Sequence, residues 1–173
     1  MIVPDDKNWT WVIERRCDEC GFDASRCAPT DVGSMVRANA AQWVVVLRGG
    51  EVATRERADR WSALEYACHV RDVFRVYDER LRRMLAEDGP HYENWDQDQT
   101  ALDDRYDRQD PAVVAGEILA VAEVLAERFD SVSDAEWSRT GYRSDGAAFT
   151  VASFARYFIH DPIHHLWDVG AAG

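Results

Sequence analysis

The chain lacks the features that mark several large classes of protein. No run of about 18 uncharged apolar residues occurs, so no segment is expected to span a bilayer. Its N-terminal residues lack a basic stretch followed by an apolar one, so we expect no secretion signal and a cytoplasmic location. It also has no internal repeat, no glycine-rich phosphate loop and no alternating pattern typical of strands. With 173 residues, these absences favour one helical domain with an ordinary core.

Basic residues are scarce relative to acidic ones. The sequence has 20 Lys and Arg against 32 Asp and Glu, which gives a formal net charge of -12. A surface of this sign repels nucleic acids and anionic membranes, so neither is an expected partner. The expected partner is a small-molecule substrate.

Cysteines are few, and three of the four lie close together. Cys17, Cys20 and Cys27 crowd the N-terminal segment, while Cys68 stands apart. A disulfide framework is not expected in a cytoplasmic chain. The Cys-x-x-Cys spacing is compatible with unmodified thiols, with half of a zinc site, or with a redox pair. No second Cys-x-x-Cys or His-x-x-x-His stands nearby in the sequence to decide among these.

Apolar residues recur at helical spacing in four long segments. These segments are residues 32–47, 63–86, 111–129 and 150–169. Ser62 with Glu65 forms a capping box before the second segment, and Thr150 is a suitable cap for the fourth. We therefore expect an all-α four-helix bundle over residues 30–173. Residues 1–29 are expected to form a cysteine-containing N-terminal extension packed on that bundle.

Histidine is also rare, and three of the five histidines fall between residues 160 and 165. His160 and His164 are four residues apart, so on a helix they project from nearly the same side and can bind one divalent ion. His165 is rotated by about 100° from His164. We therefore interpret it as a group outside the ligands of that ion or on the surface. The alternative is a helix with scattered, solvated histidines.

A further histidine, His69, can join this pair if the second and fourth helices run antiparallel. His69 lies roughly 10 Å from the start of its helix, and His164 roughly 8 Å from the end of its own, at 1.5 Å per residue. Antiparallel packing brings them level and requires a long crossover between the second and third helices. Residues 87–110 suffice, because even ten extended residues span about 33 Å. The sequence thus favours an up-down-down-up bundle with His69, His160 and His164 around one ion.

The ligand set indicates which ion would bind and how it would be used. Three neutral imidazoles suit zinc or nickel better than magnesium or calcium. Three protein ligands also leave a coordination position open, which is typical of catalytic rather than structural ions.

Three features together form a recognisable pattern. They are the Trp-Ser-Ala-Leu-Glu-Tyr segment just before His69, the long crossover, and the motif His160-Asp161-x-x-His164-His165. This pattern, over roughly residues 30–170, resembles the DinB/YfiT-like superfamily of four-helix metalloproteins. The resemblance implies a divalent ion held by His69, His160 and His164, and frequent homodimers. Characterised relatives include thiol S-transferases that use mycothiol or bacillithiol, and a mycothiol-dependent maleylpyruvate isomerase.

The leading hypothesis for function is a metal-dependent transferase that joins a low-molecular-weight thiol to a small molecule. An open ion binds a thiol as thiolate and lowers its pKa, so that it attacks at neutral pH. Tyr157 and Arg156 are candidates for orienting the substrate. One alternative is a metal-dependent hydrolase with Glu65 as general base, although the capping role of Glu65 already explains that residue. The other is a non-catalytic metal-binding or stress-response protein.

Cys68 falls on the charged face of the second helix, which is unusual for so buryable a residue. One hypothesis is that residues 1–29 lie across this face and bring their three cysteines to Cys68, forming a closed four-thiolate zinc site. The alternative is that Cys68 packs under an aromatic side chain such as Trp9 or Trp11.

Overall fold

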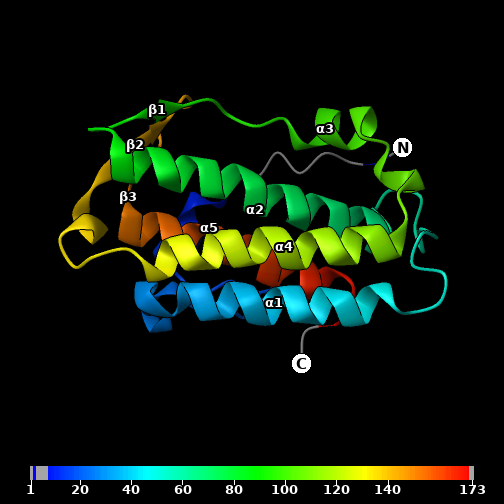
Figure 1. Cartoon of the computed structure of the whole chain (residues 1–173). Helices are drawn as coiled ribbons and strands as arrows, with labels where there is room; N and C mark the ends of the chain where they lie inside the picture. The colour runs from blue at the N-terminus through cyan, green and yellow to red at the C-terminus, as the bar shows by residue number, and fades with distance from the viewer. Residues whose placement is uncertain (1, 3–7, 172–173) are drawn as a thin grey trace.

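Four long helices form the body of the protein in a computed structural model that describes residue 2 and residues 8–171. They are α1 (Val32–Leu47), α2 (Ala63–Ala86), α4 (Pro111–Asp130) and α5 (Val151–Asp168). In Figure 1, α1 and α5 run in one direction while α2 and α4 run in the other. The predicted all-α, up-down-down-up four-helix bundle is confirmed.

Local signals explain where these helices begin. The Ser62 side chain accepts a hydrogen bond from the Glu65 amide at 3.2 Å, and the Glu65 carboxylate accepts one from the Ser62 amide at 2.8 Å. Thr150 and Ser153 make the equivalent pair at the start of α5. Pro111 occupies the first turn of α4, where a missing amide hydrogen leaves no helical bond unmade. The caps therefore fix the starts of the two helices, α2 and α5, that carry histidines.

The long connections are more regular than the sequence suggested. The crossover contains strand β1 (His91–Tyr92) and helix α3 (Gln97–Asp103). The connection to α5 contains β2 (Thr140–Arg143) and β3 (Ala148–Thr150). Strand β2 pairs in parallel with β1 and antiparallel with β3, so the two connections meet in one small sheet. The expectation of no strands was wrong, because strands this short leave no alternating pattern.

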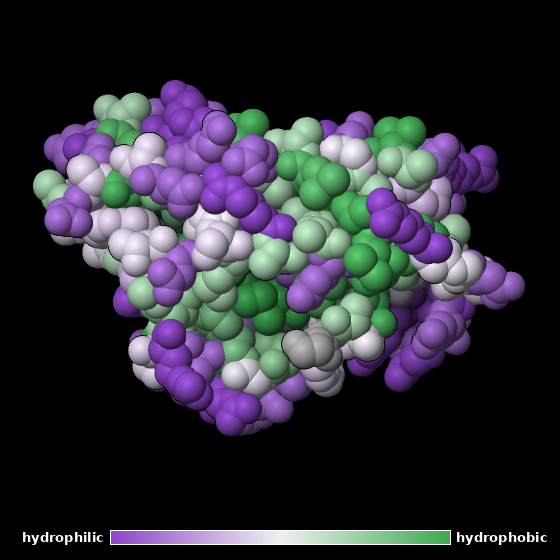
Figure 2. Space-filling model, turned by 60° about the horizontal axis from the view of Figure 1, so that its bottom comes forward, coloured by the Kyte–Doolittle hydropathy of each residue, from purple (hydrophilic) through white to green (hydrophobic). Residues whose placement is uncertain are grey.

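Aromatic side chains fill the centre of the bundle. Trp43, Phe74, Phe129 and Phe158 are at most 2% exposed, and the rings of Phe129 and Phe158 stack with centroids 5.7 Å apart. Burying one such side chain stabilises the fold by about 1.5–3 kcal/mol. Apolar residues also reach the surface, between polar ones, on the face shown in Figure 2. Within the described part of the chain, none of the helices combines the length and apolarity that a membrane span requires.

Part of the charged face of α2 is buried, although Arg75 and Glu79 on it stay exposed. Arg71 and Asp72 are 4% and 6% exposed. Arg71 donates to both oxygens of Asp72 at 2.9 and 3.0 Å, and to Glu117 on α4 at 2.7 Å. The Tyr106 hydroxyl donates to Asp72 at 2.5 Å. Cys68 lies on this same helix and is fully buried, since α4 and the turn that holds Tyr106 pack against α2.

The N-terminal segment packs against α5, not across the charged face of α2. The short helical turn Trp9–Ile13 contacts α5, and Arg156 on α5 donates to the carbonyl oxygen of Cys27 at 2.9 Å. Among the described residues, the four cysteines do not gather into one ligand group. The four-thiolate hypothesis therefore does not hold, because α4 and the crossover already cover α2. Residues 1 and 3–7 of the extension lie outside the described residues.

Replacing Asp72 by alanine should destabilise the fold strongly, because it removes the buried carboxylate that accepts two hydrogen bonds from the buried Arg71. Removing one partner of a buried ion pair costs about 3–5 kcal/mol. The matched control is Glu79→Ala, which removes a solvent-exposed pair with Arg82 and should have little effect. Urea unfolding followed by circular dichroism at about pH 7 measures both variants.

The same comparison has an expected pH dependence. Burial raises the pKa of Asp72, but hydrogen bonds from Arg71 and Tyr106 lower it more, so the net pKa lies below the ordinary value. A carboxyl whose folded-state pKa is lowered adds stability above its ordinary pKa of about 4, and that stability is lost as the pH falls further. The loss of unfolding free energy caused by Asp72→Ala should therefore stay constant from about pH 7 to pH 5 and become smaller below about pH 4. Equal stability of Asp72→Ala and Glu79→Ala at about pH 7 would contradict this assignment.

Candidate metal centre

Successive residues of α5 face two different neighbours. Among the described residues, two separate groups of side chains could each hold a metal ion, because the ligand atoms within a group all lie within 4.8 Å of one another. One group is His69, Asp161 and His165, and the other is Cys17, Cys20, His160 and His164. Adjacent residues of a helix are rotated by about 100°, so residues 160 and 161 fall into different groups. The structure does not bring His69, His160 and His164 into one such group, which differs from the sequence hypothesis.

The first group, called the cleft site below, consists of His69 from α2 with Asp161 and His165 from α5. Asp161 Oδ1 lies 3.5 Å from His69 Nε2 and 3.7 Å from His165 Nε2. Ligands bonded tetrahedrally to one ion at about 2.0–2.2 Å lie about 3.3–3.6 Å apart, so only small side-chain shifts are needed. Two imidazoles and one carboxylate form a ligand set that recurs in zinc and iron enzymes.

Unsatisfied polar atoms indicate that a cation fits between these groups. Both ring nitrogens of His69 and Oδ1 of Asp161 are buried and have no hydrogen-bond partner among the described residues. Each such atom costs about 1–3 kcal/mol unless something binds it. A divalent ion bound to His69 Nε2 and Asp161 Oδ1 would satisfy both ligand atoms, so the residues present fit a metal.

The protonation states of the cleft site also suit metal binding. Burial lowers the pKa of His69, which keeps the imidazole neutral at neutral pH. Burial raises the pKa of Asp161, but His165 and His69 lower it more, so the carboxylate stays ionised. His165 Nδ1 lies 2.9 Å from Asp168 Oδ2. With its proton on Nδ1 donated to Asp168, His165 keeps a lone pair on Nε2 for an ion.

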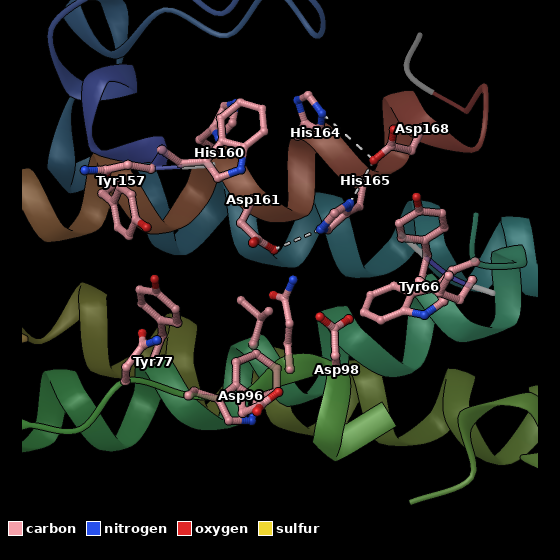
Figure 3. A pocket seen from close by; sticks show the side chains of 18 of the residues that line it. Tyr66, Tyr77, Asp96, Asp98, Tyr157, His160, Asp161, His164, His165 and Asp168 are labelled. Carbon is pink, nitrogen blue, oxygen red and sulfur yellow. Dashed lines mark hydrogen bonds and ion pairs between the residues drawn. The ribbon is translucent and has the colours of Figure 1, made fainter. Parts of the chain in front are cut away.

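The cleft site opens into a cleft of about 950 Å³. Figure 3 shows the labelled residues of α5 on one side of this cleft, with Asp96 and Asp98 from the crossover on the other. The rings of Trp61 and Trp95 pack on His69, with centroids 5.2 and 5.4 Å from the imidazole. The volume lies at the upper end of the range of about 300–1,000 Å³ for small-molecule sites.

Of the three residues considered for catalysis, Tyr157 is the one that lines the cleft. Its hydroxyl oxygen accepts a hydrogen bond from Arg143 Nη1 at 3.0 Å. The guanidinium of Arg156 is bound to a backbone carbonyl of the N-terminal segment. Glu65 is 3% exposed, and its carboxylate accepts hydrogen bonds from its own N-cap residue and from Arg55. Arg156 and Glu65 therefore have structural partners that account for them.

The second group, called the Cys-His site below, joins segments that are distant in sequence. Cys17 Sγ lies 3.8 Å from His164 Nδ1, although the two residues are 147 positions apart. Burial lowers the pKa of His160 to about 4 and raises the pKa of Cys20 to about 11. The sequence left the chemical role of the Cys-x-x-Cys motif open. The structure places this motif beside the His-x-x-x-His motif.

Sequence reasoning missed Asp161 and His165 as candidate ligands. These two residues have the same four-residue spacing as His160 and His164, and a carboxylate binds zinc as an imidazole does. The signal was therefore present. The sequence alone does not show which of these two overlapping pairs lies beside His69, because that depends on which face of α5 packs against α2.

The fold and the cleft site together define a helical-bundle protein with a candidate site for a divalent metal. A family model described as the DinB superfamily matches residues 34–169, and the chain belongs to that superfamily. Its fold is similar to that of YfiT from Bacillus subtilis, described as a probable metal-dependent hydrolase with an unusual four-helix bundle topology. The two chains are 18% identical, with a TM-score of 0.69 over 83% of each chain. No functionally curated protein matches the sequence.

Replacing His165 by alanine should remove about one equivalent of zinc per chain relative to the unmodified protein. Asp168→Asn, which loses the carboxylate that orients His165, should weaken the same binding about 10- to 100-fold. The control is His91→Ala, since His91 is exposed and stacks on Tyr142, away from both groups. Equilibrium dialysis with elemental analysis measures the stoichiometry. Unchanged zinc in His165→Ala would show that His165 is not a ligand.

Proposed function

We propose that the protein is a metal-dependent thiol S-transferase that acts on a small-molecule acceptor. The observation that carries this proposal is the grouping of His69 with Asp161 and His165, of which the last two line a cleft of about 950 Å³. Three protein ligands leave room for a further ligand on the cleft side. A zinc or nickel ion held by these three residues would supply Lewis-acid chemistry, which lowers the pKa of a bound thiol.

The surrounding side chains then position the reactants. The Tyr157 hydroxyl oxygen accepts a hydrogen bond from Arg143. The hydroxyl hydrogen is then the part of Tyr157 that donates to a substrate in the cleft. The indole rings of Trp61 and Trp95 cover His69 and keep water from its faces. In the transfer, the thiol sulfur forms a bond to an electrophilic carbon, the leaving group departs with its electron pair, and the thiol proton passes to solvent.

Thiol transfer is favoured over hydrolysis by the position of Glu65. A thiol, with an ordinary pKa of about 8.5, ionises more readily at a metal than water does, and hydrolysis therefore gains more from a nearby protein base. Glu65, the base considered from sequence, does not line the cleft and is bound to Arg55.

A second candidate function, metal-dependent hydrolysis, is favoured by one other observation. The side chain of Asp98, from α3, lies across the cleft from the α5 residues in Figure 3 and could serve as the base that Glu65 cannot. The description of YfiT as a probable metal-dependent hydrolase agrees with this alternative.

A paired assay on zinc- or nickel-loaded protein tests both candidates. Mycothiol or bacillithiol is supplied with chlorodinitrobenzene as acceptor, and loss of the thiol is followed; ester cleavage is followed separately with p-nitrophenyl acetate. We expect thiol consumption above the uncatalysed rate, lowered about 100-fold or more in Asp161→Ala and retained in His91→Ala. Asp98→Asn should leave thiol consumption near its original rate.

The opposite pattern identifies the hydrolase. Ester cleavage that depends on Asp161 and falls in Asp98→Asn, without thiol consumption, would replace the transferase proposal with the hydrolase. Inertness in both assays with metal retained would contradict both and favour a metal-binding role.

A further inference from the structure

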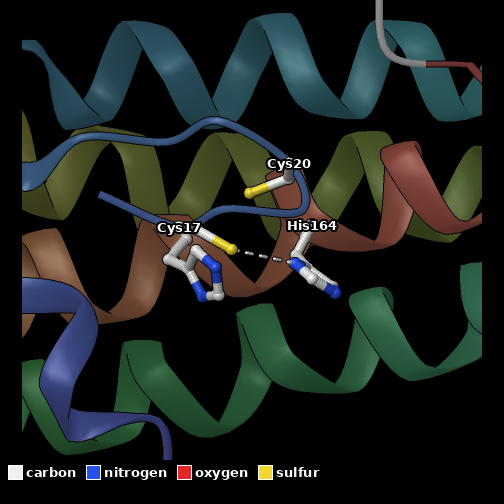
Figure 4. Close-up of side chains that lie close together, drawn as sticks. Cys17, Cys20 and His164 are labelled. Atoms are coloured by element: carbon white, nitrogen blue, oxygen red, sulfur yellow. Dashed lines mark hydrogen bonds between the residues drawn. The ribbon is translucent and has the colours of Figure 1, made fainter. Parts of the chain in front are cut away.

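We propose that Cys17, Cys20, His160 and His164 form a second metal site, a closed zinc centre that fixes the N-terminal segment to α5. This inference does not rest on the proposed activity, because the four side chains are separate from the cleft-site ligands. Figure 4 shows Cys17, Cys20 and His164 pointing toward one another from the N-terminal segment and α5.

The spacing of the ligand atoms is compatible with tetrahedral zinc after small side-chain shifts. One ligand atom from each of the four side chains lies within 4.8 Å of all the others, and Cys17 Sγ lies 3.8 Å from His164 Nδ1. For Zn–S bonds of about 2.3 Å and Zn–N bonds of about 2.0–2.1 Å, tetrahedral geometry places ligand atoms about 3.3–3.8 Å apart. Two thiolates with two imidazoles are a donor set that selects zinc among the common divalent ions.

The backbone of the N-terminal segment is shaped to present both thiols. The Gly21 amide donates to the Cys17 carbonyl at 3.0 Å, which closes a tight turn around Cys20. Gly21 has a φ of 77°, a left-handed conformation that side chains other than glycine rarely adopt. The Cys17 amide donates to the Phe22 carbonyl at 2.8 Å and locks the turn further. Cys-x-x-Cys and His-x-x-x-His are also the spacings found in structural zinc sites.

Three of the four ligands are buried, Cys20 is partly exposed, and one buried polar atom has no partner. His160 is 4% exposed, and its Nε2 has no hydrogen-bond partner among the described residues. The rings of Trp9 and Phe22 cover the His160 imidazole, with centroids 5.2 and 5.7 Å away. His160 and His164 also line the cleft described above. A bound ion would satisfy the buried Nε2 atom of His160, which otherwise has no partner.

The ring nitrogen of His164 that faces away from Cys17 lies beside Glu19, a carboxylate between the two cysteines. His164 Nε2 lies 3.2 Å from Glu19 Oε2, so a proton on Nε2 can be donated to Glu19 while Nδ1 faces Cys17. Zinc-binding histidines commonly have a carboxylate in this relation. The turn therefore supplies both ligands and the group that sets the tautomer of an opposing ligand.

Four protein ligands leave no open position, so this centre has a structural role. It cross-links residues 17–20 to residues 160–164, which is the kind of long-range link that constrains the unfolded chain most. The link holds the N-terminal segment on the helix that also carries Asp161 and His165.

Cobalt titration of the full-length, reduced and metal-free protein tests the proposal, because cobalt bound to thiolates shows charge-transfer absorption in the near ultraviolet. We expect two cobalt ions per chain, one of them with this absorption. The double variant Cys17→Ser/Cys20→Ser should lose the absorption and one ion. Cys27→Ala, a control in the same segment, should keep both, and His165→Ala should lose one ion but keep the absorption.

A ligand exchange guards against loss of binding through misfolding. His160→Cys should still bind zinc, with stronger thiolate absorption on cobalt loading, whereas His160→Ala should bind more weakly. Circular dichroism checks that each variant keeps its helices. In the His165→Ala background, zinc should protect Arg15, Arg16 and Arg26 from trypsin, and a chelator should expose them while the helices persist.

Three outcomes would overturn the proposal. One is wild-type protein without thiolate–cobalt absorption. Another is the same absorption in Cys17→Ser/Cys20→Ser as in wild type. The third is a Cys17–Cys20 disulfide in protein isolated without air or added reductant and alkylated at once, detected as two missing alkyl groups, which would assign the motif to redox chemistry.

Discussion

The rotation of about 100° between successive residues of α5 is the constraint on which both candidate sites depend. It sends Asp161 and His165 toward His69 on α2, and His160 and His164 toward the N-terminal segment. A helix packed against partners on two adjacent faces can therefore carry two ligand pairs that overlap in sequence. Neither pair forms a complete site alone, so α2 and the N-terminal turn decide what each pair becomes.

The two sites differ in what they leave open. The cleft site has three ligands beside a large cleft, which suits an ion that must also bind a reactant. The Cys-His site also reaches the cleft through His160 and His164, but it has four protein ligands, which suits an ion that holds structure. Asp168 stands between them, with Oδ2 2.9 Å from His165 Nδ1 and 3.9 Å from His164 Nε2. Asp168, at the end of α5, therefore orients His165 of the cleft site and lies close to His164 of the Cys-His site.

The sequence was sufficient for the bundle and only partly sufficient for the site. Helix starts follow from local caps such as Ser62 with Glu65, and the level of His69 follows from helix length, so both could be predicted. The rotation of α5 about its own axis decides which of its residues face α2. Apolar residues on most sides of the helix leave this rotation undetermined from sequence. Burial of Arg71 and Asp72 also depends on tertiary contacts, because a charged face looks solvent-exposed until α4 and the crossover cover it.

Crystal diffraction from zinc-loaded protein at the zinc absorption edge tests the division of α5 into two metal-binding faces most directly. The account predicts two anomalous peaks per chain, one among His69, Asp161 and His165, and one among Cys17, Cys20, His160 and His164. A single peak bound by His69, His160 and His164, with Asp161, His165 and both cysteines unbound, would contradict it.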